Sequence, residues 1–277
     1  MNRRKAMKVS AGLFAGSGIG LLTLANAFKN KDLPNEKPHK LEYDQTEGSI
    51  KYPYLNPETT AELAYRLYPD GSCMYAIVSS IVSQLAEKLG EPYSSIPLKM
   101  FAYGHGGVGG YGSLCGTLNG AAAVCGLLID DKSIRDKMIA DIFQWYEKSP
   151  LPQFTPQNPK FNFTLPSVAS NSVLCHVSNT NWCNETGFKI NSDERKEKCR
   201  RLTGDVVIKL TMTLNKVFSG EYVTNAHGDE AIGTCNSCHG KEGKLKNVSG
   251  KMSCTSCHSE SVGHKVFSDI HYKVMKE

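Results

Sequence analysis

The chain has no surplus of charge outside its first residues, no unbroken apolar run of membrane length and few segments with strand-like alternation. Its 277 residues include 32 Lys and Arg against 27 Asp and Glu. Four of the basic residues lie in residues 1–27, which contain no acidic residue, so 28 basic residues face 27 acidic ones in the rest. A nucleic-acid-binding protein concentrates basic residues on one face or stripe. We therefore exclude nucleic acid as a partner, and the rarity of alternation favours a mainly α fold.

The N-terminus has the parts of an export signal. Basic residues precede a mildly apolar run over 9–24 that four glycines interrupt, and Ala25-Asn26-Ala27 follows as a small-x-small cleavage site. Arg3-Arg4 resembles a twin-arginine signal, which exports proteins already folded. A membrane span needs about 20 predominantly apolar residues. We therefore predict a signal peptide over 1–27, cleaved near Ala27, and a periplasmic protein that is not stably inserted in the membrane after cleavage.

Three segments follow the signal peptide. Residues 28–56 form a polar, proline-punctuated arm without a periodic apolar face. Helical periodicity dominates 57–220, with stripes near 74–85, 134–146 and 202–218 that are typical of core-facing helices. Between them, 104–126 is rich in Gly and 149–181 is rich in Pro, Asn and Ser, so we expect little regular structure in either. Residues 221–277 differ in composition and form a small irregular domain.

The last segment carries one motif twice. Each copy reads C-x-x-C-H, the attachment sequence of c-type haem, in which two thiols bond the porphyrin and the adjoining His ligates the iron. The copies are Cys235-x-x-Cys238-His239 and Cys254-x-x-Cys257-His258. The domain has too few large apolar side chains to enclose two porphyrins at its size. The haems are therefore expected to form its core and to meet each other or another chain.

A zinc ribbon is the alternative for the same four cysteines. Fifteen residues separate Cys238 from Cys254, a spacing that also suits zinc. A zinc ribbon requires no His after each pair, and reduced zinc thiolates are uncommon in an oxidising compartment. The motifs therefore favour two covalent haems.

Each iron also needs a sixth ligand or an open position. We predict that His227, His264 and His271 are the distal ligands, because they flank the motifs. Met252 or Met275 is the alternative and would raise the reduction potential. His105 and His176 are interpreted as hydrogen-bonded loop histidines. Two six-coordinate haems leave no position for substrate, which predicts an electron carrier and not an enzyme; a small reductase with one open haem is the alternative function.

Six cysteines remain in the helical segment. They are Cys73, Cys115, Cys125, Cys175, Cys183 and Cys199. In an exported protein they could form three disulfides, or three or four of them could hold an iron–sulfur cluster inserted before export; the residues alone leave both open. Gly104-x-Gly106-x-x-Gly109 matches a dinucleotide fingerprint, but no strand precedes it. We interpret this segment as a close backbone approach whose N–H groups stabilise the sulfurs of a cluster.

The combination of these features resembles a known family. The twin-arginine-like leader, Cys73, the segment from Gly112 to Ala122 around Cys115, two further cysteines and the paired C-x-x-C-H motifs are similar to split-Soret cytochromes c, dihaem proteins of sulfate-reducing bacteria. The helical part alone resembles the C-GCAxxG-C-C redox family. Where that family has Gly-Cys-Ala, this chain has Leu114-Cys115-Gly116.

The resemblance implies more than the residues do. It implies a homodimer with two haems per chain, bis-His ligation, haems in near contact and distal ligands that cross between subunits. It also implies an iron–sulfur cluster, with [2Fe–2S] favoured, in the helical domain. Its ligands would be Cys73, Cys115, Cys175 and Cys199, with Cys125 and Cys183 as replacements. The partners would be other redox proteins of the periplasm.

Overall fold

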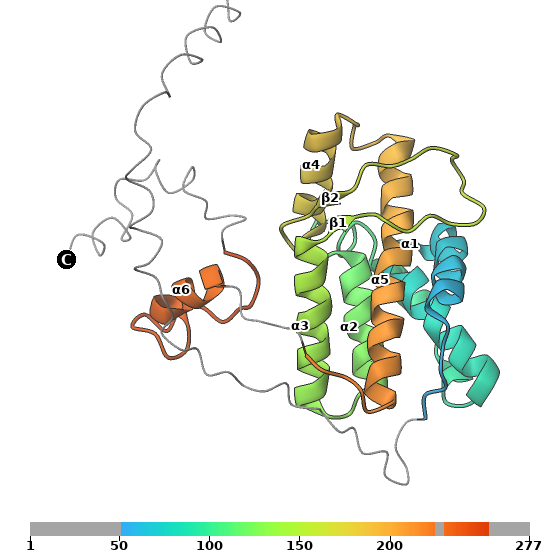
Figure 1. Ribbon diagram of the computed structural model, residues 1–277, viewed down its shortest axis with the longest axis horizontal. Helices are drawn as coiled ribbons and strands as arrows, with labels where there is room; N and C mark the ends of the chain where they lie inside the picture. Colours follow the sequence, from blue (N-terminus) through green and yellow to red (C-terminus); the bar gives the residue numbers. More distant parts are fainter. Residues whose placement is uncertain (1–50, 225–229, 255–277) are drawn as a thin grey trace, which may run out of the picture. The chain divides into compact units, whose positions relative to one another are not determined.

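The computed structural model describes residues 51–224 and 230–254, and Figure 1 shows that helices dominate them. The predicted mainly α fold class is confirmed. The signal peptide, the arm up to residue 50 and several predicted haem ligands lie outside the described residues: His227, Cys257, His258, His264, His271 and Met275. The predicted domain boundary near Gly220 stays a prediction.

The elements in chain order are α1 (Pro57–Leu89), two 3-10 helices η2 (Tyr93–Ser95) and η3 (Leu98–Tyr103), α2 (Gly116–Leu128), α3 (Lys132–Lys148), β1 (Pro150–Leu151), β2 (Val168–Ala169), α4 (Cys175–Thr186), α5 (Asp193–Phe218) and α6 (Glu230–His239). Most elements follow one another closely, but 12 residues separate η3 from α2 and 16 separate β1 from β2. Side chains of Asn56, Asp131 and Ser192 accept hydrogen bonds from first-turn amides and so cap α1, α3 and α5.

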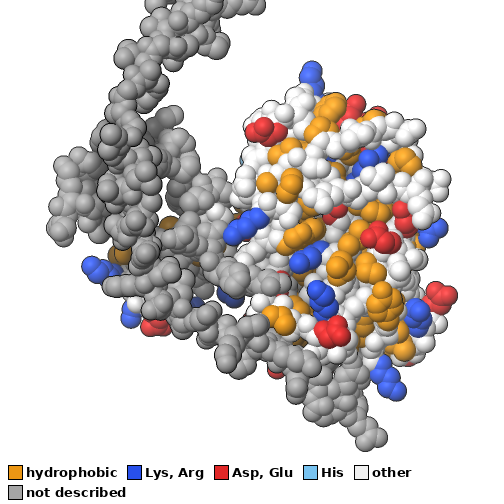
Figure 2. Space-filling view, in the orientation of Figure 1, with side chains coloured by type: hydrophobic (Ala, Val, Ile, Leu, Met, Phe, Trp, Pro, Cys, Tyr) orange, Lys and Arg blue, Asp and Glu red, His pale blue; other side chains and the backbone are white. Residues whose placement is uncertain are grey.

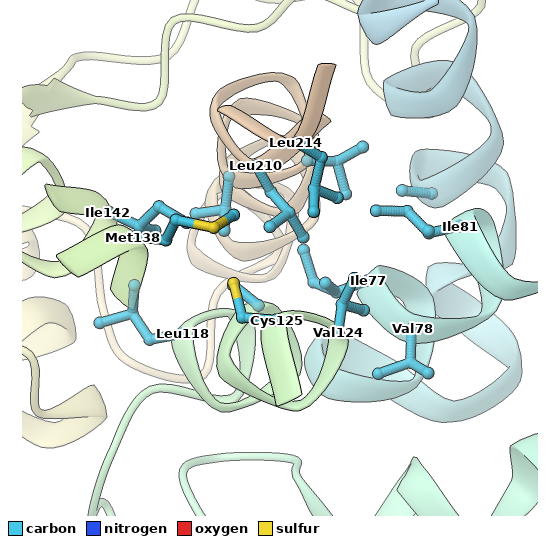
Figure 3. Packing of buried hydrophobic residues seen from close by; sticks show 14 of the residues in the cluster. Ile77, Val78, Ile81, Leu118, Val124, Cys125, Met138, Ile142, Leu210 and Leu214 are labelled. Carbon is cyan, nitrogen blue, oxygen red and sulfur yellow. The ribbon is translucent and has the colours of Figure 1, made fainter. Parts of the chain in front are cut away.

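The core lies between α1, α2, α3 and α5. Helix α1 packs against α5 and α2, and α3 packs against both α2 and α5. Figure 3 shows apolar side chains from all four helices meeting there, among them Ile77, Leu118, Met138 and Leu210. The three predicted apolar stripes supply 16 of the 33 buried residues of this cluster, so the core positions of α1, α3 and α5 agree with the sequence pattern.

Helix α2 lies inside the Gly-rich segment where little regular structure is expected, so that expectation is wrong. The helix buries Leu118, Val124 and Leu128, and its glycines allow a close approach to neighbouring backbone. A Cβ on Gly120 would stand 2.8 Å from the Cβ of Ile77 on α1. Gly and Ala residues on its other positions permit this packing, but they weaken the contrast between an apolar and a polar face, which is the signal that identifies most helices.

Helix α4 and a two-stranded pair also lie in a segment expected to be irregular. Strands β1 and β2 pair antiparallel, with Pro150 opposite Ala169 and Leu151 opposite Val168. Helix α4 consists mainly of Ser, Asn, Thr and Cys, and it buries Trp182 together with polar side chains. Its buried face is therefore largely polar, and an apolar stripe could not reveal it.

Charged side chains of both signs are mixed over the face in Figure 2, with no region of one sign. This agrees with the near-neutral balance of the sequence after residue 27. Among the described helices, none combines the length and apolar character that crossing a membrane requires.

Candidate metal centre and haem motifs

A backbone bridge brings Cys115 and Cys175 together. Leu114 and Leu174 form an isolated antiparallel bridge. The Cys115 amide donates to the carbonyl of Val173 at 2.9 Å, and the Cys175 amide donates to the carbonyl of Ser113 at 2.8 Å. The thiol of Cys175 donates a hydrogen bond to the sulfur of Cys115. Two cysteines that are 60 residues apart in sequence are therefore fixed as neighbours by main-chain bonds.

Cys73 and Cys199 reach the same place from α1 and α5. Helix α1 is interrupted at Ser72, whose φ of 66° and ψ of −156° are not helical, so a new helical part begins at Cys73. The sulfur of Cys73 interacts electrostatically with those of Cys199 and Cys115. Cys175 interacts in the same way with the other three. These residues, Cys73, Cys115, Cys175 and Cys199, are called the four-cysteine set.

Gly116 is the reason that α2 can approach Cys73. A Cβ at this position would overlap the carbonyl oxygen of Gly104 and would stand 2.9 Å from the Cβ of Cys73. An alanine after Cys115, as in the family pattern, does not fit this backbone. The departure Leu114-Cys115-Gly116 is therefore required by the close contact and does not disrupt the set.

Three members of the set lie at helix N-termini. Cys115 is the N-cap of α2, Cys175 is the first residue of α4, and Cys73 begins the second part of α1. The first-turn amides of a helix lack intrahelical acceptors, and the helix dipole places positive potential there. Three such ends converge on the sulfurs, which favours thiolates and any anionic centre that they hold.

Polar side chains surround the sulfurs. Cys73 Sγ donates to the hydroxyl of Tyr68 at 3.7 Å, and Cys115 Sγ lies 3.2 Å from Thr117 Oγ1. Asn179 bridges two other members of the set, because its Nδ2 donates to Cys175 Sγ at 3.3 Å and its Oδ1 accepts from Cys199 Sγ at 3.3 Å. Hydrogen bonds to sulfur are one of the means by which a protein tunes an iron–sulfur centre.

The thiols differ in their pKa values. The hydrogen bond from Cys175, opposed by burial, lowers the pKa of Cys115 to about 5. That hydrogen bond in turn raises the pKa of Cys175, and burial raises the pKa of Cys73. One thiolate therefore forms readily, while further thiolates need a cation that compensates their charge.

The donor chemistry of the set suits an iron–sulfur cluster, because such clusters are held by Cys thiolates. All four side chains are buried, at 5–8% exposure, and none of the nine cysteines in the described ranges forms a disulfide. In the same ranges no three His, Cys, Asp or Glu side chains are arranged to hold one metal ion. A [2Fe–2S] cluster takes four thiolates around two irons and so needs a wider ligand arrangement.

Cys125 and Cys183 lie elsewhere. Cys125 is ten residues beyond Cys115 on α2, about 15 Å along the axis, and Figure 3 shows it among core side chains. Its burial raises its pKa to about 12. Cys183 is half-buried and lies two turns beyond Cys175 on α4, about 12 Å along the axis. The structure thus brings neither proposed replacement into the set.

The Gly-rich loop uses several of its amides for hydrogen bonds within itself. The amides of Gly109, Gly110 and Gly112 donate to carbonyls within the loop, those of Tyr103, His105 and Gly106. These three amides are therefore occupied within the loop, while the close backbone approach expected of the segment occurs between Gly104 and Gly116. Helix η3 precedes the loop, so the strand that a dinucleotide site requires is missing from this part of the described chain.

The first C-x-x-C-H motif lies on α6. Cys235 and Cys238 are three residues apart on this helix and share a face, and His239 ends it. The next residues turn back, with the Leu245 amide donating to the Cys238 carbonyl at 2.8 Å. His239 Nδ1 lies 3.0 Å from Asn247 Oδ1. With Nδ1 as the donor, Nε2 carries the lone pair that an iron ligand needs.

The other predicted ligands are only partly described. Of the second motif, Cys254 is half-buried, and Cys257 and His258 lie outside the described residues. His105 and His176 are exposed, the first in the Gly-rich loop and the second at the start of α4. Asn179, Tyr146 and Asn247, which contact candidate ligands, were not singled out from the sequence, where no motif marks them.

Comparisons with known proteins agree with this geometry. Residues 75–213 match the family described as "Putative redox-active protein (C_GCAxxG_C_C)". Split-Soret cytochrome c of Desulfovibrio desulfuricans is 35% identical over 232 residues, which cover 80% of this chain and 83% of the relative. A solved structure, "A novel iron centre in the split-Soret cytochrome c from Desulfovibrio desulfuricans ATCC 27774", superposes with a TM-score of 0.73 at 32% identity and covers 77% of this chain and 92% of that one.

The chain is a mainly helical redox protein whose central helices carry the cysteine pattern of the C_GCAxxG_C_C family. More narrowly, the chain belongs to the split-Soret cytochrome c family. The resemblance inferred from the motifs is thereby confirmed.

Proposed function

We propose that this protein is a periplasmic electron carrier with two covalent haems and a [2Fe–2S] cluster in each chain. The four-cysteine set would hold the cluster, and the two C-x-x-C-H motifs would hold the haems. These groups supply reversible one-electron chemistry when bound. The observation that carries the proposal is the convergence of four buried thiols in a chain that also has both haem motifs.

The surroundings of the set support its assignment as a cluster site. The family relative is associated with an iron centre in its structural description. Here Thr117 and Asn179 contact sulfurs, and three helix N-termini direct positive potential at them. The protein's own contribution is to exclude water, orient the thiolates and stabilise their negative charge.

The haem assignment rests on the motifs and on α6. Proximal ligation by His239 is supported by the hydrogen bond from its other ring nitrogen to Asn247. His258 would be the proximal ligand of the second haem. Two of His227, His264 and His271 would complete bis-His ligation, which favours low potentials relative to His/Met ligation.

The homodimer and the export route belong to the same proposal. A domain of residues 221–277 is small for two porphyrins, so a second copy would cover them and donate distal ligands. The leader with Arg3-Arg4 would deliver the folded chain to the periplasm, where other redox proteins would exchange electrons with it.

The deciding experiment counts the haems and the cluster iron and sulfide in purified protein. Total iron, acid-labile sulfide and pyridine haemochrome are measured per chain, together with the mass in solution by light scattering. We expect about two haems, about two further irons and about two sulfides per chain, in a particle of two chains. Haem iron equal to total iron would contradict the proposed cluster. Protein that keeps no porphyrin after treatment with acidified organic solvent would contradict the proposed covalent haems.

A further inference from the structure

A buried lysine lies beside the four-cysteine set. Lys198 precedes Cys199 on α5 and is only 2% exposed. Its Nζ donates to Ser178 Oγ at 3.1 Å, and Ser178 Oγ lies 3.0 Å from the hydroxyl of Tyr146. The residue after Ser178, Asn179, contacts the sulfurs of Cys175 and Cys199. The ammonium group is therefore held by the neighbour of a residue that contacts two of the thiols.

Two donors meet at the Ser178 hydroxyl. An ammonium only donates, so Ser178 accepts from Lys198. The hydroxyl of Tyr146 also donates to Ser178 Oγ. Ser178 therefore holds the ammonium in place without neutralising its charge.

The ammonium of Lys198 has no carboxylate in hydrogen-bonding range among the described residues. The ion pairs in those ranges are Lys132–Asp136, Lys196–Asp193 and Arg201–Glu197. A buried charge without compensation is costly. Lys198 adjoins Cys199 on α5, and its acceptor Ser178 adjoins Asn179, which contacts the sulfurs of Cys175 and Cys199. The negative centre held by the four thiolates is the compensation that this site offers.

We propose that Lys198 is the internal counter-charge of the four-cysteine centre and a positioning residue that sets its reduction potential. The inference rests on the proposed cluster. One-electron reduction adds a negative charge to the centre, so a nearby fixed positive charge favours the reduced form.

The test compares Lys198→Met, Lys198→Gln and Lys198→Arg in the purified holoprotein, with redox titration of the cluster followed by electron paramagnetic resonance. Lys196→Met is the matched control, because Lys196 is on the same helix but its side chain is 58% exposed. We expect the Met and Gln variants to shift the one-electron equilibrium toward the oxidised form by about tenfold, a potential about 59 mV lower. The Arg variant and the control should stay near wild type.

Comparison of the Gln and Arg variants distinguishes the effect of the charge at position 198 from the effect of side-chain packing. Gln keeps a donor for Ser178 but no charge, so a Gln variant with the wild-type potential would overturn the proposal, as would an Arg variant shifted as far as Gln. If the Met variant fails to fold, the Gln and Arg pair decides. Wild-type protein without acid-labile sulfide would contradict the proposed cluster. A cluster that is present but keeps its potential in the Gln variant would contradict only the role of Lys198.

Discussion

Gly116 lies so close to Gly104 that a Cβ on Gly116 would overlap the carbonyl oxygen of Gly104. The carbonyl oxygen is backbone and a Cβ is attached rigidly to its own backbone, so neither atom moves aside cheaply. We expect Gly116→Ala to push α2 away from α1, to lower the free energy of unfolding by about 2–3 kcal/mol and to reduce the cluster content. Urea unfolding and acid-labile sulfide per chain measure the two effects.

Gly126 provides the control on the same helix. A Cβ at Gly126 meets no atom within 4 Å. Gly126→Ala should therefore gain about 0.5–1 kcal/mol from helix propensity and leave the sulfide content unchanged. Equal effects of the two substitutions would contradict the close-approach argument.

Helix α4 carries one proposed cluster ligand, Cys175, and one cysteine outside the four-cysteine set, Cys183. Cys175 has its sulfur in the four-cysteine set, while Cys183 is half-buried on the same helix. Cys175→Ser should abolish or strongly reduce cluster iron, because a hydroxyl replaces a thiolate ligand. Cys183→Ser should leave iron and sulfide at wild-type levels. Loss of sulfide in the Cys183 variant would show that the ligand set is wrong.

The sequence predicted what depends on local pattern. The stripes of α1, α3 and α5 are regular, and the C-x-x-C-H motifs are contiguous, so both can be identified without a structure. Helix α2 could not be found this way, because it packs through Gly116 and Gly120 and has few large apolar residues.

The centre was harder to predict from residues alone. Its four cysteines are distributed from position 73 to position 199, and spacing does not distinguish a cluster from disulfides. Their convergence depends on the break at Ser72 and on the bridge between Leu114 and Leu174, which are long-range backbone features. Only the resemblance to the family selected these four from six, and the fold places the same four together.

Asp205 makes stability depend on pH. Its buried carboxylate accepts hydrogen bonds from the amides of Gln153 and Phe154, yet burial dominates and raises its pKa to about 7. Between about pH 4 and pH 7 the folded state holds a proton that the unfolded chain has lost. The free energy of unfolding therefore falls as pH rises through this window.

The Asp205→Asn variant tests that dependence, because an amide oxygen still accepts a hydrogen bond and does not titrate. We expect wild type to lose about 2 kcal/mol relative to the variant between pH 5 and pH 8. Urea unfolding of both proteins at the two pH values measures the difference. Parallel pH profiles would exclude Asp205 as the source.

The buried ion pair on α5 should be sensitive to removal of one partner. Glu197 Oε1 accepts from Arg201 Nε at 2.9 Å and from the hydroxyl of Tyr65 at 2.7 Å. Arg201→Met leaves a buried carboxylate without its cation, which should cost about 3–5 kcal/mol. Lys196→Met breaks only an exposed pair with Asp193 and should cost less than about 0.5 kcal/mol. Similar losses in the free energy of unfolding of the two variants would contradict the argument that burial makes the Arg201–Glu197 pair sensitive.

The axial ligands of the haems distinguish an electron carrier from a reductase with an open haem. Bis-His ligation predicts that His227→Ala or His271→Ala converts one haem per chain to the high-spin state, because each substitution removes a strong axial ligand. Optical and electron paramagnetic resonance spectra measure the change, and ferric wild type should resist cyanide while the variant binds it at one haem.

His176→Ala is the control, since His176 is exposed at the start of α4. Low-spin spectra in both distal variants would show that other residues ligate the irons, and rapid cyanide binding by wild type would favour a reductase with an open haem.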